Sequence, residues 1–207
     1  MKRLLLALVC ASIAMGATVT LTMDEVSLQP INGLAVPKGG ITFTFSDAGG
    51  NLNYNSPGLG TLTYVQDPTI AGSPELFGVA FSVPVYSVQF GMAGNSTTIT
   101  PMATVRLYNG ATLITTMTLN PSVTHTSPIA TEEGQFTYSS ATPVTSFTVT
   151  PSSSFAVIAF DNLTVTTTPS TPTVPATSSL TLALMTLGIV GLGGYALRRQ
   201  FRPSTSH

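Results

Sequence analysis

The sequence predicts an all-β protein: an antiparallel β-sandwich or jelly roll, with an N-terminal signal peptide and one C-terminal transmembrane helix. Three observations predict it. Side chains alternate with period two through the middle of the chain, turn residues separate the alternating runs, and both ends combine apolar runs with basic residues. Only 7% of the 207 residues are charged, and seven Lys and Arg face eight Asp and Glu. Because a basic surface is missing, we expect no nucleic-acid partner.

Residues 1–16 have the three parts of a secretory signal peptide. Lys2 and Arg3 form the charged region, residues 4–13 form the apolar region, and small residues follow. The apolar run is too short to span about 30 Å of hydrocarbon, so we expect cleavage by signal peptidase rather than anchoring. Cys10 is the only cysteine, so the exported body would hold no disulfide or thiol chemistry.

Residues 17–165 form the predicted β-sandwich ectodomain. We expect nine or ten strands, rich in Thr, Val, Phe and Tyr, with apolar side chains on one face and hydroxyl side chains on the other. The segment 109–110, an Asn-Gly pair between two alternating runs, predicts a type I′ hairpin turn. The alternating runs are 40–45, 61–65, 79–83, 85–90, 104–108, 112–119, 136–138, 144–149 and 155–165.

A Thr, Pro and Ser linker, residues 166–177, leads to the predicted transmembrane helix at 178–197. Residues 180–197 carry no charge, and a helix of that length spans about 27 Å, enough for a bilayer core. The basic tail 198–207 contains Arg198, Arg199 and Arg202. Since arginines beside a span stay in the cytoplasm, we expect the ectodomain to face outward.

The end of the linker carries a short motif before the apolar segment: Val174, Pro175, Ala176, Thr177, Ser178 and Ser179. The motif, the apolar segment and the arginines together resemble the PEP-CTERM sorting signal of Gram-negative bacteria. Ala176 stands where that family usually has Glu, and Thr177 where it usually has Pro. The resemblance implies an exosortase-like protease as partner, transient membrane anchoring, and release to the cell surface or extracellular matrix. A plain single-pass anchor is the alternative.

Three segments of the body, 77–84, 105–110 and 160–165, are also similar to β-sandwich ectodomains found ahead of PEP-CTERM tails. In those domains an Asp-Asn-Leu strand commonly closes the fold, which matches residues 161–163. This resemblance implies the sandwich and carries no assigned activity.

The body offers few groups for catalysis, so we expect no enzyme. Its one histidine, His125, is expected in an exposed loop without a partner, and there is no Gly-x-Ser-x-Gly motif. Glu132 and Glu133 are adjacent and are interpreted as a solvated acidic turn, as are Asp24 and Glu25. A pair of hydrolytic carboxylates is therefore not indicated.

No cofactor is expected apart from calcium, for which the oxygen donors are Asp47, Asn51, Asp161 and Asn162. Turn chemistry explains the first two residues equally well. Our first hypothesis is a non-enzymatic exported surface or matrix protein. The second is a carbohydrate-binding module for exopolysaccharide, since tyrosines can stack on sugars. The tyrosines available for this are Tyr54, Tyr64, Tyr86, Tyr108 and Tyr138.

Overall fold

The computed structural model describes residues 16–168, and all regular structure within them is β, as the sequence predicts. This part of the chain contains no helix able to span a bilayer. The signal peptide, sorting motif, predicted span and arginine cluster lie outside the described residues. The strands are β1 (Thr18–Leu21), β2 (Gln29–Pro30), β3 (Ala35–Lys38), β4 (Ile41–Asp47), β5 (Asn53–Ser56), β6 (Thr69–Gly72), β7 (Phe77–Gly94), β8 (Ala103–Asn109), β9 (Thr112–Leu119), β10 (Val123–His125), β11 (Thr131–Pro151) and β12 (Ile158–Thr166).

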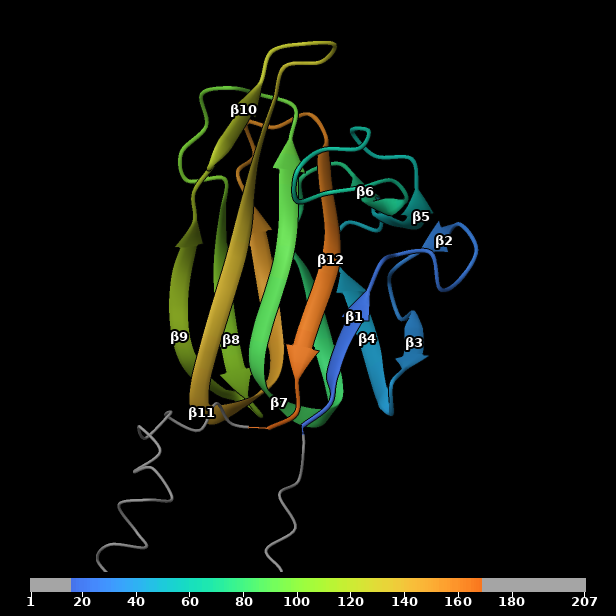
Figure 1. Ribbon diagram of the computed structural model, residues 1–207, viewed down its shortest axis with the longest axis vertical. Helices are drawn as coiled ribbons and strands as arrows, with labels where there is room; N and C mark the ends of the chain where they lie inside the picture. Colours follow the sequence, from blue (N-terminus) through green and yellow to red (C-terminus); the bar gives the residue numbers. More distant parts are fainter. Residues whose placement is uncertain (1–15, 169–207) are drawn as a thin grey trace, which may run out of the picture. The chain divides into compact units, whose positions relative to one another are not determined.

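Two long strands, β7 and β11, pair with each other along both of their halves. Residues 77–80 of β7 pair with residues 146–149 of β11, and residues 87–94 pair with residues 132–139. Between these segments the register of β11 is interrupted twice, at 139–144 and 144–146. Both strands bend there and pass together from one layer of the sandwich to the other. A single hydrogen-bonded sheet therefore folds over on itself as two layers (Figure 1).

The first layer consists of β3, β4, the N-terminal half of β7, the C-terminal half of β11, β8 and β9. The second layer consists of β2, β5, β6, β12, the C-terminal half of β7 and the N-terminal half of β11. Strand β1 joins this layer beside β12, and β10 joins it beside β11. All of these pairs are antiparallel.

Aromatic rings from the two layers meet in the core. Phe90 of the second layer stacks on Phe147 of the first, with ring centroids 5.5 Å apart. Phe77 and Phe160 meet edge to face at 5.2 Å, also across the layers. Each such ring buries about 150–250 Å², so this cluster supplies much of the apolar burial that holds the layers together. The period-two pattern of the sequence places these rings on the inner faces, as β4 shows by alternating buried and more exposed residues.

The strand pattern differs from the prediction in three respects. The described residues form twelve strands where nine or ten were expected, because the short strands β1, β2, β3, β5, β6 and β10 lie outside the predicted runs. Residues 61–65 alternate like a strand but form none; they belong to the loop between β5 and β6. The separately predicted runs 79–83 and 85–90 are one strand, β7, and the runs 136–138 and 144–149 are one strand, β11. Bends inside β7 and β11 break the local pattern without ending the pairing.

The hairpin between β8 and β9 forms at the expected place, but with a different turn. Asn109 pairs with Thr112, so the two central residues are Gly110 and Ala111. Positive φ falls on Gly110 (φ 57°) and not on Asn109 or Ala111. A type I′ turn needs positive φ at both central residues, whereas a type II′ turn needs it only at the first. The type I′ prediction is therefore wrong. The turn is centred one residue later than expected, and its single positive φ fits a type II′ turn.

Replacing Gly110 with Val should lower the free energy of unfolding by about 1–2 kcal/mol, because a β-branched residue resists positive φ. Urea denaturation measures the change. The neighbouring variant Ala111→Val is the matched control and should have a smaller effect, since φ at this position is not positive. Equal stability of the two variants would contradict the turn assignment.

Candidate functional site

The loop between β5 and β6, residues 57–68, lies on the outer face of the second layer; we name it the covering loop. Val65 packs against Ala93 of β7 and Ala159 of β12, with Leu59 and Leu62 beside them. The loop backbone approaches the sheet closely at Gly91, where an added Cβ would lie 2.1 Å from the Tyr64 carbonyl oxygen. Only glycine at position 91 allows this contact.

Two buried carboxylates hold the covering loop. Glu133, with 0% exposure, accepts hydrogen bonds from the backbone amides of Thr63 (2.9 Å) and Tyr64 (2.8 Å). Asp161 accepts one from the amide of Gln66 (2.9 Å). Burial raises the pKa of Glu133, but hydrogen bonds from His125, Tyr64 and Thr63 outweigh it and lower this pKa below its ordinary value. The carboxylate under the loop is therefore ionised.

Glu132 and Glu133 do not form the solvated turn that the sequence suggested. Both lie on β11, where their side chains face opposite sides of the strand, and both are buried. Glu132 accepts a hydrogen bond from the amide of Ile99 (3.0 Å), in the connection between β7 and β8. Burial raises the pKa of Glu132 above its ordinary value. The two carboxylates thus bind two different loops.

His125 is also not the unpartnered loop residue that the sequence suggested. It ends the short strand β10, and its Nε2 lies 2.8 Å from Oε1 of Glu133. Because β10 pairs with β11, His125 stands opposite Thr131 and close to Glu133. A period-two pattern extended back from Phe136 to residue 131 would have placed both glutamates on the strand.

The calcium candidates hold turns and loops of the protein. Asp47 accepts hydrogen bonds from the amides of Gly49 (3.3 Å) and Leu52 (2.9 Å), and Asn51 contacts Glu75. The two candidate pairs stay apart, since Asp47 ends β4 in the first layer and Asp161 lies on β12 in the second. Within residues 16–168, no three His, Cys, Asp or Glu side chains gather as a metal site would require.

Asp161 and Asn162 form a bulge in β12. The register between β12 and β7 shifts between Asp161 and Thr164, and Asn162 has φ 55°, which Asn tolerates better than most residues. The Asn162 side chain donates a hydrogen bond to the Tyr64 carbonyl (3.1 Å) and so binds the covering loop. Oδ1 of Asp161 is buried without a partner in the described part of the chain, and burial raises the pKa of this carboxyl to about 6.

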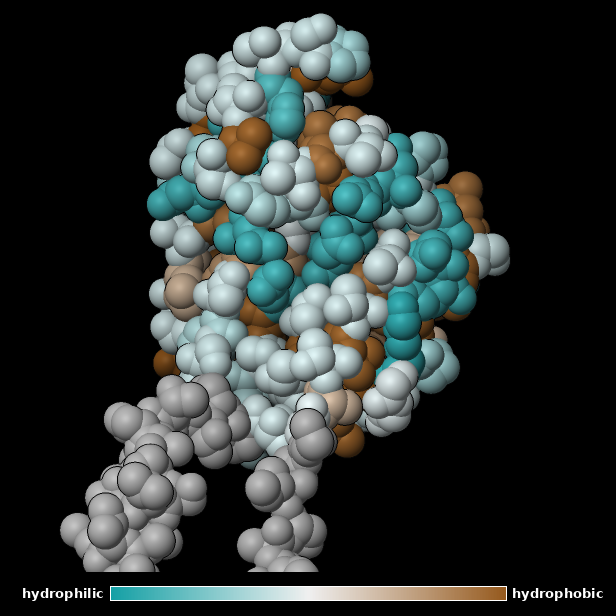
Figure 2. Space-filling model, viewed as in Figure 1, coloured by the Kyte–Doolittle hydropathy of each residue, from teal (hydrophilic) through white to brown (hydrophobic). Residues whose placement is uncertain are grey.

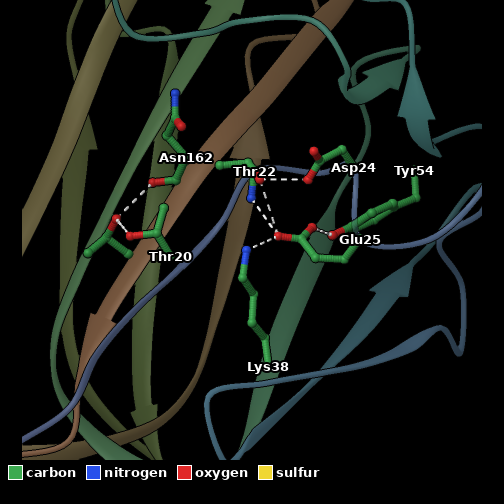
Figure 3. Close-up of polar contacts among 8 residues, drawn as sticks. Thr20, Thr22, Asp24, Glu25, Lys38, Tyr54 and Asn162 are labelled. Carbon is green, nitrogen blue, oxygen red and sulfur yellow. Dashed lines mark hydrogen bonds and ion pairs between the residues drawn. The ribbon is translucent and has the colours of Figure 1, made fainter.

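A second polar cluster surrounds Glu25 (Figure 3). Glu25 accepts hydrogen bonds from Nζ of Lys38, from the hydroxyl of Tyr54 and from the amide of Thr22. Burial raises the pKa of Glu25, but these three hydrogen bonds outweigh it and lower the pKa to about 2. Glu25 therefore joins β3, β5 and the segment after β1, whereas neighbouring Asp24 is exposed, as predicted.

The tyrosines are not arranged as a sugar-stacking face. Tyr54 has 0% exposure, and Tyr138 packs against the core. The half-buried Tyr64, Tyr86 and Tyr108 lie on the covering loop, the bend of β7 and β8, respectively. No ring contact joins two tyrosines within residues 16–168.

No protein-family model and no curated protein matches the sequence. Two solved structures, a carbohydrate-binding module of family 29 and a mutant of such a module, resemble the chain at 10% identity. Their TM-scores are 0.33 and 0.34, and both alignments cover 74% of this chain, with 90% and 94% of the respective modules. A similarity this low supports no inference about function.

Replacing Glu25 with Gln should lower the free energy of unfolding by about 2 kcal/mol at pH 7, because hydrogen bonds to a charged group contribute about 1.5–3 kcal/mol. The folded pKa of about 2 lies below the ordinary 4.5, so the stabilisation is complete above pH 4.5 and is lost as the pH falls towards 2. Urea denaturation at several pH values measures it. Asp24→Asn is the control and should have little effect; a Glu25→Gln deficit that persists at pH 2 would contradict the assignment.

Asp161 should make the protein more stable at mildly acidic pH. Its folded pKa of about 6 lies above the ordinary 3.8, so the folded state binds the proton more tightly and gains stability as the pH falls through 6. The stability of wild type relative to Asp161→Asn should therefore rise by about 2 kcal/mol between pH 7.5 and 4.5. Parallel stability curves for the two proteins over this range would contradict it.

Proposed function

We propose that this chain is an exported, non-catalytic β-sandwich protein that is displayed at the cell surface or in the extracellular matrix and sorted through its PEP-CTERM-like tail. The observation that carries the proposal is the pairing of the first strand with the last. Thr18 of β1 pairs with Thr166 of β12, and the amide of Thr167 donates a hydrogen bond to the carbonyl of Ala17 (3.2 Å). The chain thus enters and leaves the domain at one end (Figure 1).

This arrangement suits display on a tether. The loop that joins β10 to β11 lies at the opposite end of the sandwich from the start of β1 and the end of β12 (Figure 1). A tether attached after Thr166 would not cross the sandwich, and the far loops would face away from the attachment point. The motif, the charge-free segment and the arginines follow in the order that sorting requires.

The surface chemistry supports an extracellular location. Threonines and serines occupy outward positions where most soluble proteins have charges, and the visible face is largely of intermediate hydropathy (Figure 2). Lys38 and Arg106 are the only cations within residues 16–168, against eight acids. The net negative charge disfavours association with nucleic acid and helps to keep the body soluble.

The histidine environment supports a non-catalytic role. Nε2 of His125 lies 2.8 Å from Oε1 of Glu133. Glu133 also accepts hydrogen bonds from two loop amides, so this carboxylate has a structural use in holding the covering loop.

Replacing Val174 and Pro175 with Ala tests the sorting tail without changing the predicted span. In an exosortase-containing host, the wild type should appear as a shorter released form, and the double variant should remain longer and bound to the membrane. Intact-mass analysis of the membrane and medium fractions measures both properties. Ser170→Ala with Thr171→Ala is the control and should behave as wild type. Identical mass and location for the motif variant and the wild type would leave a plain single-pass anchor.

A further inference from the structure

A cavity of about 240 Å³ lies between the covering loop and the hairpin that joins β10 to β11. Residues 59–62 of the covering loop form one wall, and residues between 125 and 131 form the other. The cavity belongs to the end of the sandwich that lies away from the start of β1 and the end of β12. None of its lining residues belongs to β1, to β12 or to the C-terminal tail.

Both walls are held by the same buried carboxylate. Glu133 binds the amides of Thr63 and Tyr64, directly after the first wall, and Nε2 of His125, in the second wall. Because the carboxylate is fully buried and ionised, these bonds are charge-assisted and fix the spacing between the walls. The cavity is therefore formed before any ligand enters, which reduces the ordering cost of binding.

One buried polar group at this cavity lacks a hydrogen-bond partner among residues 16–168, and one partly exposed ring nitrogen lies beside it. Thr131 lines it with 1% exposure, and its buried hydroxyl has no hydrogen-bond partner within the described residues. His125 uses Nε2 for Glu133, so Nδ1 of its ring, whose side chain is 30% exposed, is the atom left to bind another group. Nearly all buried polar groups in proteins are paired, and an unpaired one costs about 1–3 kcal/mol. This cost applies to Thr131, and a ligand that bears hydroxyl groups would pair the threonine hydroxyl and would also hydrogen-bond to Nδ1 of His125.

The lining indicates the chemistry of the ligand. No Lys or Arg lines the cavity, and the Glu133 carboxylate lies behind it, so an anion is disfavoured. Apolar side chains alternate with hydroxyl groups, which suits a ring with C–H faces and hydroxyl edges. The volume is below the range of about 300–1,000 Å³ for drug-sized ligands, so it admits one such ring. The apolar lining includes Leu59, Leu62 and Pro128, and the hydroxyl lining includes Thr61, Ser127 and Thr131.

We infer that this cavity binds one neutral sugar residue, either free or at the end of a glycan chain, with Thr131 and His125 as its polar contacts. The site differs from the tyrosine-stacking surface that the sequence suggested, because it uses hydroxyl and aliphatic side chains instead of aromatic rings. It does not depend on how the tail is processed.

Isothermal titration calorimetry of the full chain in detergent tests the site with methyl glycosides of glucose, mannose, galactose and N-acetylglucosamine. At least one should bind. Thr131→Val should weaken that binding about tenfold, the loss expected for one hydrogen bond, without lowering the melting temperature, because the hydroxyl has no protein partner. Thr131→Ser keeps the hydroxyl and should retain binding. Thr104→Val, in a different cavity, is the matched control and should bind as wild type.

A second variant covers the case in which Thr131→Val does not fold. Ser127→Phe changes an exposed residue at the rim and should abolish binding by filling the cavity.

Three outcomes would overturn the proposal: none of the glycosides binds, both variants bind as tightly as the wild type, or glucuronic acid binds more tightly than glucose. Oligosaccharides that bind as well as the monosaccharide would identify a chain end as the ligand, and weaker binding would identify the free sugar. If the cavity binds no sugar, the mass and location of the exported protein are still as the sorting proposal expects. Failure of the sugar-binding proposal is therefore distinguishable from failure of the sorting proposal.

Discussion

The pairing of β7 with β11 is the constraint on which the rest of the structure depends. Both strands pass from one layer to the other, so their hydrogen bonds connect the layers through the backbone as well as through the core. The pair carries Phe90 into the second layer and Phe147 into the first, where the two rings stack. Strands β4 and β8 attach to it in one layer and β12 in the other, so the position of every other strand follows from it.

The few charges of this chain serve mainly to hold loops. Seven of the eight acids accept a hydrogen bond from a backbone amide, and the eighth, Asp24, accepts one from the hydroxyl of Thr22. A loop on a sheet has amides that the sheet cannot pair, and a carboxylate is a strong acceptor for them. This use of the acids explains how loops on a surface rich in hydroxyl groups are fixed, and it leaves few carboxylates for catalysis.

The covering loop connects this structural use of charge to a binding site. Glu133 and Asp161 hold the loop backbone, and Val65 packs on Ala93 and Ala159 beneath it. The same bonds to Glu133 set the distance between the loop and His125, and the cavity results from that distance. A protein that displays a sandwich at the surface would thus present a preformed cavity at the end farthest from its tether.

The sequence by itself determined the all-β class, the positions of the six longest strands and the chain reversal between β8 and β9, because each depends on neighbours in the chain. Period-two alternation indicates which side chains are buried, and a glycine in a short turn indicates where the chain reverses. Only the tertiary structure decided that residues 61–65 form a loop, that Glu132 and Glu133 are buried, and that His125 has a partner. Bonds such as those from Thr63 to Glu133 and from Gln66 to Asp161 join residues far apart in the chain. An alternating segment has the same local pattern whether it pairs in a sheet or lies across one, so its environment is set by distant residues that the local sequence does not contain.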